Sequence, residues 1–143
     1  MSAVKLRHRA ATVATLALTS GLLGVAGTSA ASTDPPAPSI AKVTSSVALK
    51  RAVYSYSKAF LGDNPVKAYK LLTPRCREKV SLSYFTGIVT AAGDMYGPQP
   101  IRSYGATMKR NRARATYRYR LHELDQVREP WRRIGGAWKN DDC

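Results

Sequence analysis

The chain has 143 residues, with 23 Lys and Arg against 9 Asp and Glu, so its formal net charge is +14. It contains two cysteines, Cys76 and Cys143, in no CxxC arrangement, and beyond residue 30 its one histidine is His122. A structural metal site needs about four ligands, and a reactive thiol pair would be expected to show a CxxC motif or a neighbouring histidine. These counts therefore argue against a metal centre, and we expect no cofactor.

The N-terminal residues have the three parts of an export signal. A positively charged leader is followed by an uncharged run over residues 10–26, and then by small residues around Ala30. This order predicts a Sec-type signal peptide over residues 1–30, cleaved after Ala30 or Ala31. An uncleaved membrane anchor would need roughly 20 strongly apolar residues, whereas threonines dilute this run. We expect a secreted protein without a membrane anchor after cleavage.

Residues 31–41 include the proline-rich stretch Asp34-Pro35-Pro36-Ala37-Pro38 and lack apolar periodicity. This composition is typical of an extended spacer. About 113 residues follow the signal peptide, which is enough for one small domain with one core. We therefore predict a single domain over residues 42–143.

The first half of this domain has helical patterns. Apolar residues at steps of three and four predict a helix from about Ile40 to Leu61, with its inward face formed by Leu49, Val53, Tyr56 and Phe60. A polar residue followed by proline then occurs twice, and each pair predicts a capped helix start, at Asn64-Pro65 and at Thr73-Pro74.

Two further helices are expected from these starts. The short second helix would carry inward Val66, Tyr69 and Leu72. The third helix would run to about Gly93, with one shared face at steps of four formed by Cys76, Val80, Tyr84 and Ile88. Cys76 is therefore expected to point toward the core.

After Gly97-Pro98-Gln99-Pro100 the apolar period becomes two. Residues 112–120 alternate, with Ala and Tyr on one face and on the other Arg112, Arg114, Arg118 and Arg120. Residues 101–109 form the expected partner strand, and a final hairpin is predicted from Trp131–Ile134 and Ala137–Asn140, which flank Gly135-Gly136. The fold class predicted is α+β, with three N-terminal helices packed on a curved antiparallel sheet of about four strands.

This order of elements resembles the nuclear-transport-factor-2-like (cystatin-like, cone-shaped) superfamily, and in particular small exported proteins of that type from actinobacteria. The stretches that carry the resemblance are Gly62-Asp63, residues 68–76, Ala115-Thr116-Tyr117 and residues 130–143, which end in Trp-x-Lys-x-Asp-Asp-Cys. The resemblance implies a pocket at the wide end of the cone. It does not imply one activity, because this fold serves isomerases, cyclases, dehydratases and non-catalytic binders.

The two cysteines of an exported protein are expected to form a disulfide, Cys76–Cys143. This disulfide closes a loop of 68 residues, and the chain-entropy model gives such a bond about 4 kcal/mol of added stability. The alternatives are a reactive thiol pair and an intermolecular bridge, and neither has a supporting motif in the chain.

Acid–base enzymes of the resembling superfamily use an aspartate inside the cone, helped by partners in a desolvated pocket. The acids that we place on a strand are Asp141 and Asp142, which makes them the catalytic candidates, whereas Glu129 is assigned to a loop. The alternative is that Asp141 or Asp142 pairs with arginines on the sheet. The candidate pocket residues are Tyr56, Tyr69, Tyr84 and Tyr117.

Between Arg102 and Arg120 there are seven basic residues and no acid. The face with Arg112, Arg114, Arg118 and Arg120 is therefore a candidate site for an anionic partner such as an envelope polymer, or a solubilising surface. No motif for specific nucleic-acid binding accompanies it.

Three functional interpretations follow. The first is an exported, non-catalytic domain that binds a small apolar ligand or an envelope partner. The second is a small exported isomerase- or cyclase-type enzyme that uses Asp141 or Asp142, and the third is a cationic envelope-binding factor. A carboxylate that faces the interior of the cone would favour the second over the first.

Overall fold

The computed structural model describes residues 40–143, so the predicted signal peptide and the spacer up to residue 39 lie outside the described part. Helices come first and strands follow, which confirms the α+β class. The helices are α1 (Ile40–Leu61), α2 (Pro65–Lys70), α3 (Pro74–Lys79) and α4 (Leu82–Tyr96). The remaining elements are β1 (Ser103–Lys109), β2 (Arg112–Arg118), the 3-10 helix η1 (His122–Leu124), β3 (Gln126–Ile134) and β4 (Ala137–Asn140).

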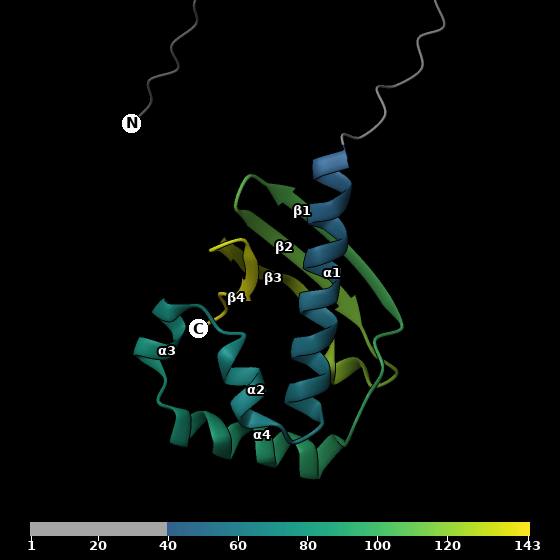
Figure 1. The fold of residues 1–143 in the computed structure, drawn as a ribbon. Helices are drawn as coiled ribbons and strands as arrows, with labels where there is room; N and C mark the ends of the chain where they lie inside the picture. Colours follow the sequence, from purple (N-terminus) through teal and green to yellow (C-terminus); the bar gives the residue numbers. More distant parts are fainter. Residues whose placement is uncertain (1–39) are drawn as a thin grey trace, which may run out of the picture. The chain divides into compact units, whose positions relative to one another are not determined.

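The four strands form one antiparallel sheet in the order β1-β2-β3-β4. Helix α1 lies along one face of this sheet, and α4 crosses near the C-terminal end of α1 (Figure 1). Within residues 40–143, no helix is long and apolar enough to cross a bilayer. The residues between α2 and α3 add a short parallel bridge beside β4, through Leu72 and Asn140.

The predicted third helix is wrong in one respect, because the structure divides it into α3 and α4. Val80 adopts an extended conformation (φ −126°, ψ 115°), and the Ser81 side chain caps α4 by accepting a hydrogen bond from the backbone N–H of Tyr84. The hydroxyl of Tyr69 donates to the carbonyl oxygens of Arg77 and Val80, which satisfies the end of α3. The chain therefore has four α-helices in its described part, and not three.

This break rotates the second half of the predicted face away from the core. Tyr84 is 67% exposed and Ile88 is 40% exposed, whereas Phe85 and Val89 are buried in their place. Val66 was also expected inward but is exposed on α2. Cys76, which precedes the break, is fully buried as predicted.

The final hairpin forms where Gly135-Gly136 predicted it. Both glycines have positive φ, 55° and 81°, as a type I′ turn requires. Strand β3 begins at Gln126, earlier than the expected Trp131, and its pairing with β2 contains a bulge. At this bulge Arg128 has a φ of 57°, and its backbone N–H donates to the Thr116 hydroxyl.

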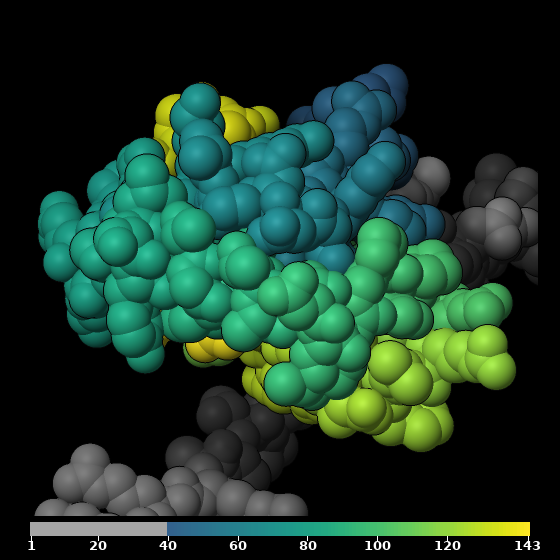
Figure 2. Space-filling model, turned by 90° about the horizontal axis from the view of Figure 1, so that it is seen from below, coloured from purple at the N-terminus to yellow at the C-terminus, as the bar shows by residue number. Residues whose placement is uncertain are grey.

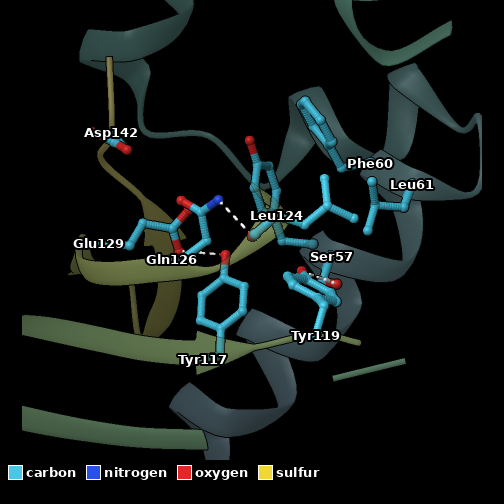
Figure 3. Close-up of a pocket in the computed structure, with 10 residues that line it drawn as sticks. Ser57, Phe60, Leu61, Tyr117, Tyr119, Leu124, Gln126, Glu129 and Asp142 are labelled. Atoms are coloured by element: carbon cyan, nitrogen blue, oxygen red, sulfur yellow. Dashed lines mark hydrogen bonds between the residues drawn. The ribbon is translucent and has the colours of Figure 1, made fainter. Parts of the chain in front are cut away.

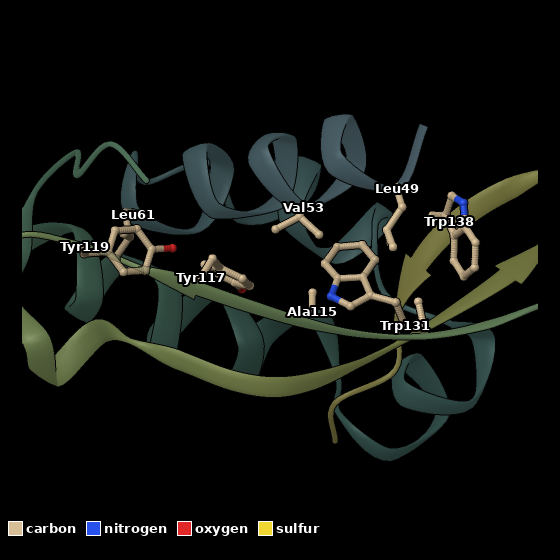
Figure 4. Close-up of a cluster of buried hydrophobic side chains, with 9 residues drawn as sticks. Leu49, Val53, Leu61, Ala115, Tyr117, Tyr119, Trp131 and Trp138 are labelled. Atoms are coloured by element: carbon tan, nitrogen blue, oxygen red, sulfur yellow. The ribbon is translucent and has the colours of Figure 1, made fainter. Parts of the chain in front are cut away.

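The main core lies between α1 and the sheet, as Figure 4 shows. Side chains from α1 point down onto inward side chains of β2, β3 and β4, and the fully buried members of this contact are Leu49, Val53, Ala115 and Trp131. A second cluster fills the space among the four helices and comprises Ala59, Ala68, Leu72, Cys76, Phe85 and Val89. Every second residue of β2 is buried from Ala113 to Tyr117, which confirms the predicted alternation.

The predicted disulfide between Cys76 and Cys143 is present, with a Cα–Cα distance of 5.5 Å. It joins the start of α3 to the last residue of the chain, three residues beyond the end of β4. Backbone hydrogen bonds Thr73 N–H to Asn140 O (2.8 Å) and Asn140 N–H to Leu71 O (2.8 Å) hold the same two segments together. The C-terminal segment is thus fixed to the helical half of the domain.

Candidate functional site

A pocket of about 220 Å³ lies between the C-terminal half of α1 and the sheet. Its walls combine aromatic and aliphatic side chains with a few polar groups, and the lining residues are Tyr56, Ser57, Phe60, Leu61, Tyr117, Tyr119, Leu124, Gln126, Glu129 and Asp142 (Figure 3). None of these ten residues, all from the described part of the chain, is lysine or arginine. At this end of the molecule, α4 and the yellow-green residues around η1 form the surface in Figure 2.

The carboxylate of Glu129 is the most buried charged group of the pocket, with a relative exposure of 6%. One carboxylate oxygen, Oε2, accepts hydrogen bonds from the Tyr117 hydroxyl (2.8 Å) and the Trp131 indole N–H (2.7 Å). The other, Oε1, accepts from the side-chain amide of Asn140 (2.7 Å). Burial raises the pKa of Glu129, and these three hydrogen bonds oppose the rise because they favour the ionised form.

The tyrosine hydroxyls of the pocket are held in neutral form. Burial, followed by the nearby Glu129 carboxylate, raises the pKa of Tyr117, and the same two causes raise the pKa of Tyr56. Burial also raises the pKa of Tyr119 to about 12, although its hydroxyl lies 2.6 Å from the Ser57 hydroxyl. The pocket therefore offers neutral hydroxyl groups beside one buried carboxyl group.

Asp142 lines the pocket from the C-terminal segment, at the side opposite Leu61 in Figure 3. Asp142 is exposed, and its backbone N–H donates to the side-chain oxygen of Asn140 (3.0 Å). The neighbouring Asp141 points elsewhere. Its carboxylate accepts from the Thr73 hydroxyl (2.7 Å) and lies 3.2 Å from Arg75 and 3.5 Å from Arg132.

The two aspartates proposed from the sequence therefore have different surroundings. Asp141 has the arginine pairing that was the alternative to catalysis for the two aspartates. Together with the disulfide, its contacts fix the C-terminal segment and thereby hold Asp142 at the pocket. Asp142 remains a candidate by position, at the edge and not in the interior.

Two of the four proposed pocket tyrosines do not line it. Tyr84 lies exposed on α4, because the break at Val80 turns it outward. Tyr69 packs against Phe85 in the helical cluster, with ring centroids 5.6 Å apart. Its hydroxyl donates a hydrogen bond to the Val80 carbonyl oxygen at the end of α3. Tyr56 and Tyr117 do line the pocket.

Glu129 is the site residue that the sequence reasoning missed, since it was assigned to a loop and the structure places it in β3. A signal was present, because Glu129 precedes the inward Trp131 by two residues and a strand returns to the same face with period two. Pro130 between them is a signal against such an extension, since proline is depleted within strands. Here Pro130 is tolerated beside the bulge that contains Arg128.

The four arginines of the candidate site for an anionic partner also differ from one another. Arg112, Arg114 and Arg118 lie on the exposed face of β2, whereas Arg120 follows the end of the strand. Arg118 is paired with Asp125 at 2.9 Å, and the Tyr119 backbone N–H and Arg118 hold the pKa of that carboxyl below its usual range. Arg114 donates to the Arg128 carbonyl oxygen (3.3 Å).

No family model, no curated protein and no solved structure matches this chain. The functional proposal therefore depends on the residues of the pocket itself. Their arrangement can bind a small molecule between aromatic walls, and can exchange hydrogen bonds or a proton with it through Glu129, Tyr117 and Ser57. An anionic ligand is disfavoured, because Glu129 and Asp142 would repel it and no lining residue carries a positive charge.

Proposed function

We propose that this protein is a single-domain small-molecule binder of the nuclear-transport-factor-2-like type, which acts outside the cytoplasm. The observation that carries the proposal is the pocket of about 220 Å³, lined by aromatic rings and by the buried Glu129 carboxyl group. Ligand sites are typically concave and mostly apolar, with a small number of placed polar groups. The Cys76–Cys143 disulfide supports the location, because such bonds persist in oxidising compartments.

The size of the pocket limits the ligand. A dry cavity of about 150 Å³ accommodates benzene, and pockets for drug-sized molecules begin at about 300 Å³. A volume of about 220 Å³ therefore suits one ring with a short substituent, or a short chain, and a larger ligand would extend beyond it into solvent. The lining selects a neutral or positively charged ligand with an apolar body.

The test is native mass spectrometry of protein recovered from the culture medium of its own organism, with two tryptophan variants. Gln126 lines the pocket, so Gln126→Trp should fill it and remove the bound mass. Val127 is the next residue and is 66% exposed, so Val127→Trp is the matched control and should retain the ligand. Equal retention of the same small molecule by both variants, or no retained molecule on wild type, would contradict the proposal.

An acid–base enzyme of the isomerase type is a second candidate, favoured by one observation. Glu129 is a buried carboxyl group on the pocket wall, with a pKa raised by burial, as a general base in such a site requires. Asp142 lies at the edge, so Glu129 replaces the aspartates as the proposed base.

The two candidates differ in what happens to a retained ligand in deuterated water. An enzyme that abstracts a carbon-bound proton through Glu129 would incorporate deuterium into the ligand. The Glu129→Asp variant has a side chain shorter by one methylene group, so its carboxylate would lie farther from the ligand and the incorporation would be slower. A binding protein would release the ligand with an unchanged mass. Incorporation that is equally fast with Glu129→Asp would exclude Glu129 as the base.

A further inference from the structure

The outward face of the sheet carries a row of cations that crosses the strands instead of following one of them. In the strand register, Lys109 of β1 lies opposite Arg112 of β2, Arg112 lies opposite Arg132 of β3, and Arg132 lies opposite Lys139 of β4. We name these four residues the cross-strand basic row. Neighbouring strands are about 4.8 Å apart, so the row is a line of positive charges about 15 Å long.

Such a row is unfavourable for the isolated protein. Like charges directly opposite each other destabilise a sheet, and here three successive pairs are of this kind. One carboxylate, Asp141, lies 3.5 Å from Arg132, and it is shared with Arg75 at 3.2 Å. Arg114, on the same face of β2, adds a further charge beside the row. Lys139 donates from its Nζ to the Lys70 carbonyl oxygen (2.8 Å), which carries no formal charge. Positive charge therefore remains in excess at this place.

A hollow of about 110 Å³ lies at the middle of the row. Three arginines surround it, namely Arg112, Arg114 and Arg132, and the lining between them comes from Ala113, Pro130, Trp131 and Asp141. The hollow is several times the roughly 10–15 Å³ that one water molecule needs, so it accommodates one phosphate group. Arginine guanidinium groups bind phosphate oxygens in bidentate fashion.

From this geometry we propose that the cross-strand basic row binds a linear phosphodiester polymer that carries no bases, of the polyol phosphate kind, with one phosphate in the hollow and its neighbours along the row. The polymer runs across the strands, because the charges do. Single-stranded nucleic acids are bound on platforms of exposed aromatic rings. The aromatic residues of these strands lie on the inward face of the sheet, where they build the core and the pocket: Tyr104, Tyr117, Trp131 and Trp138.

This proposal is independent of the pocket and differs from the site expected along β2 alone. Arg118, at the far end of that strand, has its own carboxylate partner, Asp125. Lys109, Arg132 and Lys139 come from the other three strands and enter the site through the register, which the sequence alone did not fix.

The test measures binding of wild type to poly(glycerol phosphate) of defined length over a range of salt concentrations. Four phosphate contacts on a flexible strand give a slope of log affinity against log salt of about −2.8, or about −0.7 for each contact. The double variant Arg112→Gln/Arg132→Gln should halve this slope and bind about 60-fold more weakly at 50 mM salt, since each lost contact costs about eightfold there. Its melting temperature should be no lower than that of wild type.

The matched control removes the same charge elsewhere. Arg51 and Arg77 are exposed on α1 and α3, so Arg51→Gln/Arg77→Gln should bind within about twofold of wild type and keep the slope. An equal loss in both double variants would overturn the proposal, because only net charge would then matter. Unchanged binding by the row variant, or no binding by wild type at 50 mM salt, would overturn it as well.

Two competing probes test the identity of the polymer. Single-stranded DNA with the same number of phosphates should bind more weakly than poly(glycerol phosphate), and stronger binding would overturn the choice of a polymer without bases. Vesicles of phosphatidylglycerol present the same phosphodiester on a flat surface. If wild type binds the vesicles and not the soluble polymer, the proposal is wrong and the face contacts a membrane.

Discussion

The inward and outward faces of β2 have opposite chemistry. Ala113, Ala115 and Tyr117 point inward, and the first two are covered by α1 while Tyr117 reaches the pocket. Arg112 and Arg114 point outward, one residue away along the chain, into solvent. A single strand with period two thus separates an aromatic, acidic pocket from a basic surface.

This difference explains how a chain with a high positive charge can have a pocket that no lysine or arginine lines. Strand alternation sends every arginine of β2 to the outside, and the carboxyl groups reach the inside from elsewhere, Glu129 from β3 and Asp142 from the C-terminal segment. The proposed ligands of the two surfaces therefore differ, because the pocket would exclude anions and the basic row would bind them. The predictions below test whether they are also independent of each other in stability and in binding.

The largest expected effect comes from the disulfide, which fixes the C-terminal segment to α3. Cys143→Ser should lower the free energy of unfolding by about 4 kcal/mol, because the bond closes a loop with a sequence separation of 67. It should also weaken ligand binding in the pocket, because the C-terminal segment that carries Asp142 is released. The cross-strand basic row should keep its salt-dependent affinity. Urea unfolding and the two binding assays measure this, and equal losses at both surfaces would contradict it.

Glutamine substitutions at two neighbouring positions of β2 should have different effects on the free energy of unfolding, because the two side chains lie on opposite faces of the sheet. Ala113 is 4% exposed, so Ala113→Gln places a larger side chain and an unpaired amide group in the core. The substitution should lower the free energy of unfolding by about 3 kcal/mol. Arg112→Gln, its control one residue away, should not destabilise the fold. The midpoints of chemical unfolding decide the matter, and a loss of stability in both variants would show that the alternation is not the main determinant.

Much of this comparison could be predicted from the sequence, because period two requires only local information. The alternation of β2, the Gly135-Gly136 turn and the pairing of Cys76 with Cys143 are all confirmed. What could not be predicted depends on long-range placement. The break at Val80 uses hydroxyl hydrogen bonds from Tyr69, which is eleven positions earlier in the chain.

The candidate site was predictable in part for the same reason. Tyr56 and Tyr117 were identified because each lies on an inward face of a regular element. Glu129 was missed because its position depends on a bulge and on a proline inside a strand. The cross-strand basic row was missed because it exists only once the register of four strands is known.

The pH dependence of stability should distinguish the inner carboxyl group from the outer charges. The pKa of Glu129 is raised in the folded protein above its ordinary value of 4.5, so the folded state binds more protons than the unfolded state above that pH. The stability of wild type relative to Glu129→Gln should therefore fall as pH rises from about 4.5 through the raised pKa. Urea unfolding at a series of pH values measures this difference, and a difference that grows with pH would show that the hydrogen bonds from Tyr117, Trp131 and Asn140 outweigh burial.

The smallest expected effect concerns the outer face, where stability and binding should change in opposite directions. Arg112 lies directly opposite both Lys109 and Arg132, so Arg112→Gln removes two like-charge pairs and should raise the free energy of unfolding by about 0.5 kcal/mol. The gain should disappear in 1 M salt, where the screening length is about 3 Å. Arg51→Gln on α1 lacks such neighbours across a sheet and should change stability less. If Arg112 lowers the stability of the isolated protein, this supports a role in binding, so a loss of stability on Arg112→Gln would remove this support for the basic row as a binding site.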